Sequence, residues 1–169
     1  YMGIMKQMID PEHDLFKLPL AQKIRDPDRS VSFAAFSLIG QSLSRNSPIQ
    51  VLMDVDIRRS TWERIRETAD KHYEPGKFTT FPAYEFTSSP GDSVVMDGYA
   101  ALFARNLHRN VIYKGDEVSD IPFSSLDSQN PEDLWDWMDK ERAKGITLMA
   151  IPHNGNMSGG KMYQKTQYN

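Results

Sequence analysis

The clearest structural signal in the chain is an apolar run that ends in a histidine, Ile146-Thr147-Leu148-Met149-Ala150-Ile151-Pro152-His153-Asn154. A short, mostly apolar run that leads to a proline is typical of a buried strand. This strand would place His153 at its carboxyl end. Two more segments combine a strand pattern with a side chain that can bind a metal, Phe81-Pro82-Ala83-Tyr84-Glu85-Phe86 and Asn106-Leu107-His108-Arg109-Asn110-Val111-Ile112-Tyr113.

These three segments predict a metal site. Strand ends converge on one face of an α/β sheet or barrel, so Glu85, His108 and His153 are expected to meet in space. Two neutral imidazoles and one carboxylate form a metal site with open coordination positions. The alternative is structural, because a histidine at a strand end is often simply hydrogen-bonded. His13, in a polar loop, and His72, in the last turn of a predicted helix, are assigned no ligand role.

The remaining pattern alternates helices with strands. We expect helices at Tyr1–Ile9, at Ser30–Ser44, from the capping box Ser60-Thr61-Trp62-Glu63 to Pro75-Gly76, and from Asn130 to Gly145. We expect strands at Phe78–Phe86, at Asn106–Tyr113 and in the run that ends at Ile151. The other segments are predicted as irregular (Pro11–Arg29), as helix or strand (Val94–Ala104) and as a long loop (Lys114–Gln129).

The helix before the last strand has the strongest boundary signals. Asn130 can cap it, Pro131 suits its first position, and Gly145 can stop it. Its apolar face is predicted to consist of Leu134, Trp135, Trp137 and Met138. Strand, helix and strand in this order predict parallel strands joined by a right-handed crossover, as in an α/β fold.

Composition limits the class of protein. The chain has 169 residues, a formal charge of −3 and 39% hydrophobic residues, which fits one domain over residues 1–169, or a piece of one. Its 20 basic and 23 acidic residues form no cluster of either sign, so the sequence gives no sign of nucleic-acid binding. No apolar run approaches the ~20 residues of a membrane span. Without cysteine, any metal must be held by nitrogen and oxygen.

The glycine-rich stretch after His153 offers a different interpretation. Gly155-Asn156-Met157-Ser158-Gly159-Gly160-Lys161 has the spacing of a phosphate-binding loop and follows a strand. The next residue is Met162, however, where such a loop needs a hydroxyl to bind Mg²⁺. We therefore expect a loop that borders the metal site and not a nucleotide cradle.

Four segments of the chain form a specific combination of motifs: Pro82-Ala83-Tyr84-Glu85-Phe86-Thr87, Asn106-Leu107-His108-Arg109-Asn110-Val111, Leu134-Trp135-Asp136-Trp137 and Ile151-Pro152-His153-Asn154-Gly155-Asn156. In this order they closely resemble an uncharacterised bacterial group, the domain-of-unknown-function family 3604. That group looks like a branch of the PHP (polymerase and histidinol phosphatase) superfamily. The resemblance runs from about residue 78 to 162, and Tyr1-Met2-Gly3 resembles the residues just after the family's Asp-His-Ala-Glu segment.

The resemblance implies an α/β fold that is part of a distorted (β/α)7 PHP-type barrel. Such barrels hold two or three Zn²⁺, Mn²⁺ or Fe ions and usually hydrolyse phosphoesters. By motif, Glu85 matches a carboxylate that bridges two metals, and His108 and His153 match histidines that complete the shell of the second metal. The family's opening His-x-His pair and its carboxyl-terminal Asp or Glu and His ligands have no counterpart here. We therefore expect an incomplete fragment of a larger barrel.

The sequence thus predicts a metal-dependent hydrolase that acts on a small or phosphorylated substrate through metal-activated water. Arg109, Asn110, Asn154 and Asn156 are predicted to hold substrate oxygens or to orient the ligands. The alternative is a catalytically inactive binding module in which the three residues form a structural network. Open strand edges in a barrel fragment also predict association with a second copy or with a missing segment of the parent chain.

Overall fold

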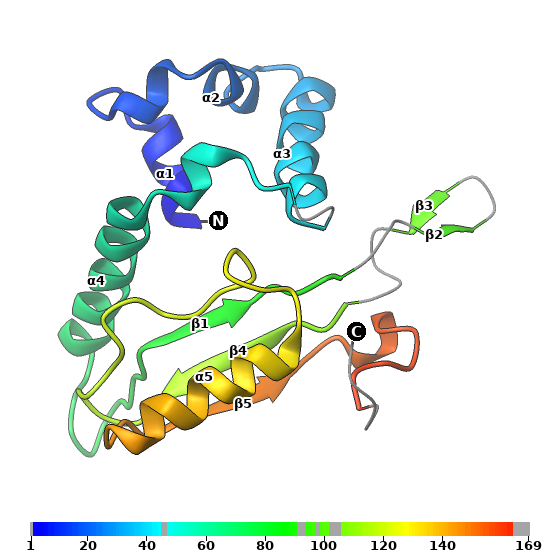
Figure 1. The fold of residues 1–169 in the computed structure, drawn as a ribbon. Helices are drawn as coiled ribbons and strands as arrows, with labels where there is room; N and C mark the ends of the chain where they lie inside the picture. Colours follow the sequence, from blue (N-terminus) through cyan, green and yellow to red (C-terminus); the bar gives the residue numbers. More distant parts are fainter. Residues whose placement is uncertain (1, 45–46, 91–93, 97–98, 102–105, 164–169) are drawn as a thin grey trace. The chain divides into compact units, whose positions relative to one another are not determined.

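The computed structural model describes residues 2–44, 47–90, 94–96, 99–101 and 106–163. Contacts divide the chain into two compact units, Tyr1–Thr61 and Trp62–Asn169, whose elements are labelled in Figure 1. The expectation of one domain over residues 1–169 stays a prediction, since two compact units can belong to one domain. All the residues predicted to form the site lie in the second unit.

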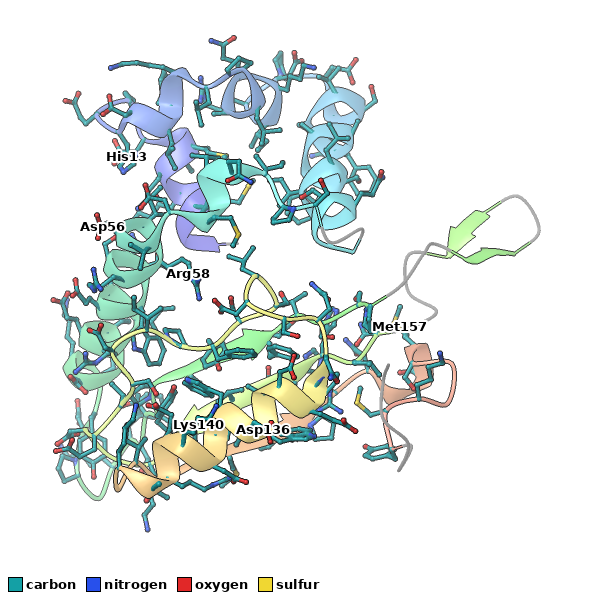
Figure 2. All side chains as sticks on the ribbon, in the orientation of Figure 1. His13, Asp56, Arg58, Asp136, Lys140 and Met157 are labelled. Carbon is teal, nitrogen blue, oxygen red and sulfur yellow. The ribbon has the colours of Figure 1, made fainter. Side chains whose placement is uncertain are left out.

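The described part of the first unit is helical. Its elements are α1 (Met2–Ile9), the 3-10 helix η1 (Asp14–Lys17), α2 (Pro19–Ile24), α3 (Arg29–Ser44) and the 3-10 helix η2 (Gln50–Met53). The prediction of an irregular segment at Pro11–Arg29 is therefore wrong. Pro19 opens helix α2, and at the first position of a helix proline costs no backbone hydrogen bond. His13, labelled in Figure 2, caps η1 by accepting a hydrogen bond from the amide of Leu15 (3.2 Å).

Helix α4 (Val55–Lys71) begins earlier than predicted. The side chain of Asp54 accepts hydrogen bonds from the amides of Asp56 (2.9 Å) and Ile57 (3.2 Å), and so caps the helix. The prediction of a start at Ser60 is wrong, because an equally good cap lies upstream and the residues between the two are compatible with a helix. Trp62, the first residue of the second unit, is 1% exposed, and its indole donates to the Ser119 carbonyl of the same unit (2.8 Å).

A three-stranded antiparallel sheet forms the centre of the second unit. Its strands, in the order in which they pair, are β1 (Ala83–Phe86), β4 (Arg109–Tyr113) and β5 (Leu148–Pro152). Both pairs are antiparallel, so the predicted parallel crossover is wrong. The long loop between β4 and α5 (Pro131–Ala143) runs back along the sheet, so α5 starts near the beginning of β4 and β5 returns antiparallel (Figure 1).

The two faces of this sheet differ. Cross-strand pairs in an antiparallel sheet lie on the same face. One face packs under α5 around a buried cluster of Trp62, Phe86, Val111, Tyr113, Leu134, Met138 and Leu148. The register Glu85↔Asn110↔Ile151 puts Glu85 on the other face, where Met149 and Ile151 are 56% and 45% exposed. This open sheet is either a complete layer or a section of a larger closed sheet, so the barrel stays a prediction.

The boundaries predicted for α5 are confirmed. Asn130 accepts a hydrogen bond from the Glu132 amide (3.1 Å), Pro131 is the first residue, and Gly145 has the positive φ of 97° that a helix stop requires. Of the four residues predicted on its buried face, Leu134 and Met138 are buried and Trp137 is half-buried, but Trp135 is exposed, so the prediction is wrong for Trp135. Asp136 and Lys140 lie on the outer side of the helix (Figure 2).

The segment predicted as either helix or strand contains strands. β2 (Val94–Met96) and β3 (Tyr99–Ala101) pair as an antiparallel hairpin, while residues 97–98 and 102–104 of that prediction lie outside the described part of the chain. Among the helices that the structure describes, none has the length and apolar content needed to cross a membrane.

Candidate metal centre

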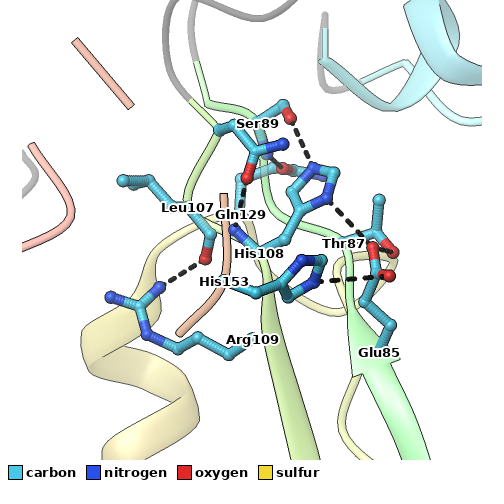
Figure 3. A network of polar contacts seen from close by, with 9 residues as sticks. Glu85, Thr87, Ser89, Leu107, His108, Arg109, Gln129 and His153 are labelled. Atoms are coloured by element: carbon cyan, nitrogen blue, oxygen red, sulfur yellow. Dashed lines mark hydrogen bonds and ion pairs between the residues drawn. The ribbon is translucent and has the colours of Figure 1, made fainter. Parts of the chain in front are cut away.

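Glu85, His108 and His153 lie together at one end of the sheet (Figure 3). Glu85 belongs to β1, His108 directly precedes β4, and His153 directly follows β5. Because β4 runs antiparallel to its neighbours, its beginning lies beside the ends of both. The His153 amide donates to the His108 carbonyl (3.2 Å), which extends the ladder to the two histidines. The three residues therefore converge as predicted, but through antiparallel pairing.

The carboxylate of Glu85 faces both histidine rings. Its Oε1 lies 3.0 Å from Nδ1 of His108, and its Oε2 lies 3.4 Å from Nε2 of His153. One donor atom from each residue falls in a group whose members are all within 4.8 Å of one another. Each oxygen of the Glu85 carboxylate thus contacts a different histidine ring.

Glu85 stays ionised far into the acid range. The hydrogen bond from His108 lowers the pKa of Glu85 to about 2, against the opposing effect of partial burial. The Thr87 hydroxyl donates to Oε1 (2.8 Å), and this bond and the charges of the two histidines lower the pKa further. An anionic carboxylate next to two imidazoles is the form that binds a cation.

The donor set fits a divalent ion. Nε2 of His153 is buried and has no hydrogen-bond partner among the described residues, although it lies 3.4 Å from a carboxylate oxygen. A buried nitrogen without a partner is costly and rare in proteins. Ligand atoms about 2.0–2.2 Å from a tetrahedral ion are roughly 3.3–3.6 Å apart, and the spacings from the two Glu85 oxygens to the two rings, 3.0 and 3.4 Å, are close to this range. An ion bound between Glu85 and His153 would use the nitrogen that has no hydrogen bond among the described residues.

Further polar residues hold His108, and the sequence patterns gave no sign of them. Nε2 of His108 lies 3.0 Å from the Ser89 hydroxyl, and its amide donates to the Asn106 side chain (3.1 Å). The Ser89 amide in turn donates to the Gln129 side chain (2.8 Å). Thr87 was detectable because it follows Glu85 by two positions, directly after strand β1, but Gln129 is 40 residues from Ser89 and gave no local signal.

Arg109 does not reach the cluster. It pairs with Phe86 across the sheet and is 4% exposed. Its guanidinium donates to the carbonyl oxygens of Leu107 and Met162 and lies 4.9 Å above the ring of Trp135. Figure 3 shows it pointing away from the histidines. The structure therefore gives Arg109 a packing contact on the opposite face, and we do not propose it as a substrate ligand.

The three predicted asparagines are exposed. Asn110 is the cross-strand partner of Glu85 and lies on the same face. Asn154 follows His153 in the left-handed conformation (φ 57°), and Asn156 lies in the 3-10 helix η3 (Gly155–Met157). All three reach solvent, as a substrate-binding role requires, and Asn110 and Asn154 lie beside residues of the cluster.

The glycine-rich stretch forms a turn beside the site. The Asn106 amide donates to the Met157 carbonyl (3.1 Å), which ties this turn to the segment that carries His108. The Lys161 amide donates to the Ser158 carbonyl (3.2 Å), and up to residue 163, where the described part ends, no helix opens at Lys161. The stretch is a loop, as expected, and lacks the helix that follows a phosphate-binding loop.

Comparison with known proteins places the chain in a family. A search of curated proteins and a search of solved structures each found no match. A family model described as "Protein of unknown function (DUF3604)" matches residues 1–169. Because this match spans the full sequence, the chain belongs to the DUF3604 family.

Proposed function

We propose that Glu85, His108 and His153 bind a divalent ion, Zn²⁺, Mn²⁺ or Fe²⁺, in a metal-dependent hydrolase of the PHP type that acts on phosphoesters. The observation that carries the proposal is the convergence of one carboxylate and two imidazoles around a buried His153 nitrogen without a hydrogen-bond partner. The motifs shared with the family also favour the PHP assignment. Neither the substrate nor the barrel is needed for the metal site itself.

The chain's own residues suit this chemistry. The Glu85 carboxylate is ionised at neutral pH, so no proton has to leave it before a cation enters. The side chains of Glu85 and His153 are 40% and 28% exposed, which leaves a solvent path to the site. When bound, a divalent ion supplies a Lewis acid and lowers the pKa of water towards about 7. The exposed amides of Asn110 and Asn154 would hold substrate oxygens.

A second candidate function rests on the contacts of His108. The Ser89 hydroxyl, the His108 ring and the Glu85 carboxylate follow one another at 3.0 and 3.0 Å, the order of nucleophile, base and acid in serine hydrolases. Among the described residues around Ser89, the amides that would form an oxyanion hole are not available. The Ser89 amide already donates to Gln129, and the next residue is proline, which has no amide hydrogen. A serine-hydrolase arrangement would also give the His153 nitrogen no role, so we favour the metal site.

Metal titration tests the proposal. Chelator-stripped protein is titrated with Zn²⁺, Mn²⁺ and Fe²⁺ by calorimetry, in the wild type and in Glu85→Gln and His153→Ala. His72→Ala is the matched control, because His72 is exposed and lies outside the cluster. We expect stoichiometric binding that both site variants weaken and the control retains. Equal binding in all four proteins would contradict the proposal.

Activity then separates the two functions. Metal-loaded protein is screened with a phosphomonoester and a phosphodiester, with and without chelator. Hydrolysis that the chelator abolishes supports the metal-dependent hydrolase. Hydrolysis of acyl esters that survives chelation, with covalent labelling of Ser89 by a fluorophosphonate, would favour the serine nucleophile. Stoichiometric metal binding with no hydrolysis by the intact parent would favour the inactive binding module.

A further inference from the structure

We propose that Ser89 and Gln129 are positioning residues that hold the His108 ring with Nδ1 facing the cluster and support the tautomer needed for metal binding. The inference rests on the proposed metal site and adds to it residues that no motif of the sequence indicated. It also gives a function to the long loop that precedes α5, since Gln129 is the last residue of that loop before the Asn130 cap.

The two ring nitrogens of His108 face different partners. Nδ1 lies 3.0 Å from Glu85 and points into the cluster, whereas Nε2 lies 3.0 Å from the Ser89 hydroxyl on the far side of the ring (Figure 3). Nδ1 can offer its lone pair to an ion only if the ring proton is on Nε2. Because the His108 side chain is only 16% exposed, an Nε2 proton needs an acceptor from the protein. The Ser89 hydroxyl is that acceptor.

A hydroxyl suits this position better than a carbonyl or an ammonium group. Without an ion, Nδ1 carries the proton and donates to Glu85, and Ser89 can then donate to Nε2. With an ion on Nδ1, the ring would give up its Nδ1 proton to solvent and take one on Nε2, and the Ser89 oxygen would accept a hydrogen bond from that Nε2–H. Serine is therefore satisfied in both states, and the ring keeps its orientation when a metal enters or leaves.

Gln129 fixes the backbone that carries this hydroxyl. Its side-chain oxygen accepts from the Ser89 amide (2.8 Å), and its side-chain nitrogen donates to the Ser125 carbonyl within the loop (2.9 Å). The hydroxyl of the fully buried Ser88 donates to the Gln129 carbonyl. The Ser88 carbonyl accepts from the Leu107 amide (2.9 Å), next to His108 in the chain. The loop before α5 is thus connected to His108 by its hydrogen bonds to both Ser88 and Ser89.

Substitutions that keep or remove the hydroxyl test this role. We expect Ser89→Ala to lower Zn²⁺ affinity about 10–100-fold, as the loss of an outer-shell partner of a ligand does. Ser89→Thr keeps a hydroxyl and should stay within about threefold of the wild type. Gln129→Met, which keeps the length but removes the acceptor, should fall between the two. Ser60→Ala is the control, because its hydroxyl bonds to the Ile57 carbonyl within α4.

Two further readouts separate positioning from a structural role. The metal-free unfolding midpoint should fall by no more than a few degrees in Ser89→Ala, whereas a purely structural hydroxyl would lower it without changing affinity. In the Zn²⁺-loaded wild type, the ¹⁵N shifts of His108 should show a protonated Nε2 and a ligated Nδ1. That measurement decides the matter even if a variant fails to fold, because the opposite tautomer would overturn the inference.

The ways in which the inference can fail are distinguishable. If the wild type binds no metal, the proposed function is wrong and this inference with it. If the wild type binds Zn²⁺ and Ser89→Ala binds it equally tightly, the metal site stands and the positioning role of Ser89 is wrong.

Discussion

Glu85 connects the chemistry of the candidate site with its stability. Its carboxylate is shared by two rings and a threonine hydroxyl, at distances from 2.8 to 3.4 Å. Without an ion, these contacts stabilise the anion. The same contacts therefore give Glu85 a role in the fold that can be measured without metal.

Acid should remove the stabilisation that comes from Glu85. Its pKa is lowered from 4.5 to about 2 in the folded chain, chiefly by the His108 hydrogen bond. A depressed carboxyl pKa stabilises the fold above pH 4.5, and this contribution is lost as the pH falls from 4.5 towards 2. Because the carboxylate is 40% exposed, solvent screens it, and we expect about 1 kcal/mol.

The measurement is urea unfolding of chelator-treated protein at pH 6 and pH 3. The free energy of unfolding should fall by about 1 kcal/mol less in Glu85→Gln than in the wild type, because the variant has no carboxylate to protonate. Parallel losses in the two proteins would show that Glu85 does not contribute.

Replacing His153 by Ala should affect metal binding far more than folding. The variant loses one neutral nitrogen ligand, and His153 is a half-buried residue at a strand end with little apolar contact to lose. We expect metal content to fall well below one equivalent while the unfolding midpoint of the metal-free protein stays within a few degrees. Full metal content in this variant would remove His153 from the site.

The metal-ligand cluster could be predicted from the types of its residues more than from their positions in the sequence. Histidine and glutamate in apolar strands are conspicuous in a sequence, so Glu85, His108 and His153 were found. Arg109 was misassigned because the face of a strand residue depends on the register, which the sequence does not contain. Ser89 and Gln129 were missed because their contact is formed only after the chain has folded.

At the scale of elements, α5 covers the buried face of the sheet. Its signals are local, since Asn130, Pro131 and Gly145 act on the backbone within a few positions, and its boundaries were predicted correctly. The direction in which β4 and β5 pair is not set by such local signals. The rule that strand, helix and strand give a parallel pair assumes a helix that carries the chain back, but here the loop before α5 does this.

Removing the cap of α5 should destabilise the fold modestly. In Asn130→Ala the Glu132 amide loses its acceptor, and we expect about 1 kcal/mol less free energy of unfolding. Asn130→Asp keeps a capping oxygen and should remain near the wild type. Urea unfolding of the three proteins checks the prediction, which fails if Ala and Asp give the same value.

Trp62 should matter more to stability than Trp137. Trp62 is 1% exposed, contacts Tyr84 and Tyr113, and donates to the Ser119 carbonyl. Trp62→Ala should cost about 3–5 kcal/mol, whereas Trp137→Ala should cost less because Trp137 is half-buried. Thermal unfolding of both variants gives the order, and a larger loss for Trp137→Ala would contradict the packing described.

At the scale of the whole molecule, the three candidate ligands and their supporting residues all lie in the unit Trp62–Asn169. A fragment of residues 54–169, which keeps the Asp54 cap of α4, should therefore fold and bind Zn²⁺ within about threefold of the full chain. Calorimetry of the two proteins tests this. A folded fragment that no longer binds would mean that the first unit contributes to the site.

The expected association with a second copy or a missing segment also belongs to this scale. The face that carries Glu85 exposes Met149 and Ile151, and β1 and β5 are the edges of the three-stranded sheet. Such surfaces favour association. The number and topology of the strands could not be predicted from local patterns alone, since they depend on how sheet edges are paired.

Anomalous diffraction from Zn²⁺-loaded crystals tests the central claim most directly. The account predicts one strong peak bounded by a Glu85 oxygen, Nδ1 of His108 and Nε2 of His153, each about 2.0–2.2 Å from the ion. The peak should disappear in crystals of His153→Ala or be greatly weakened. Stoichiometric Zn²⁺ at a different place in the chain, with these three side chains unliganded, would contradict the account.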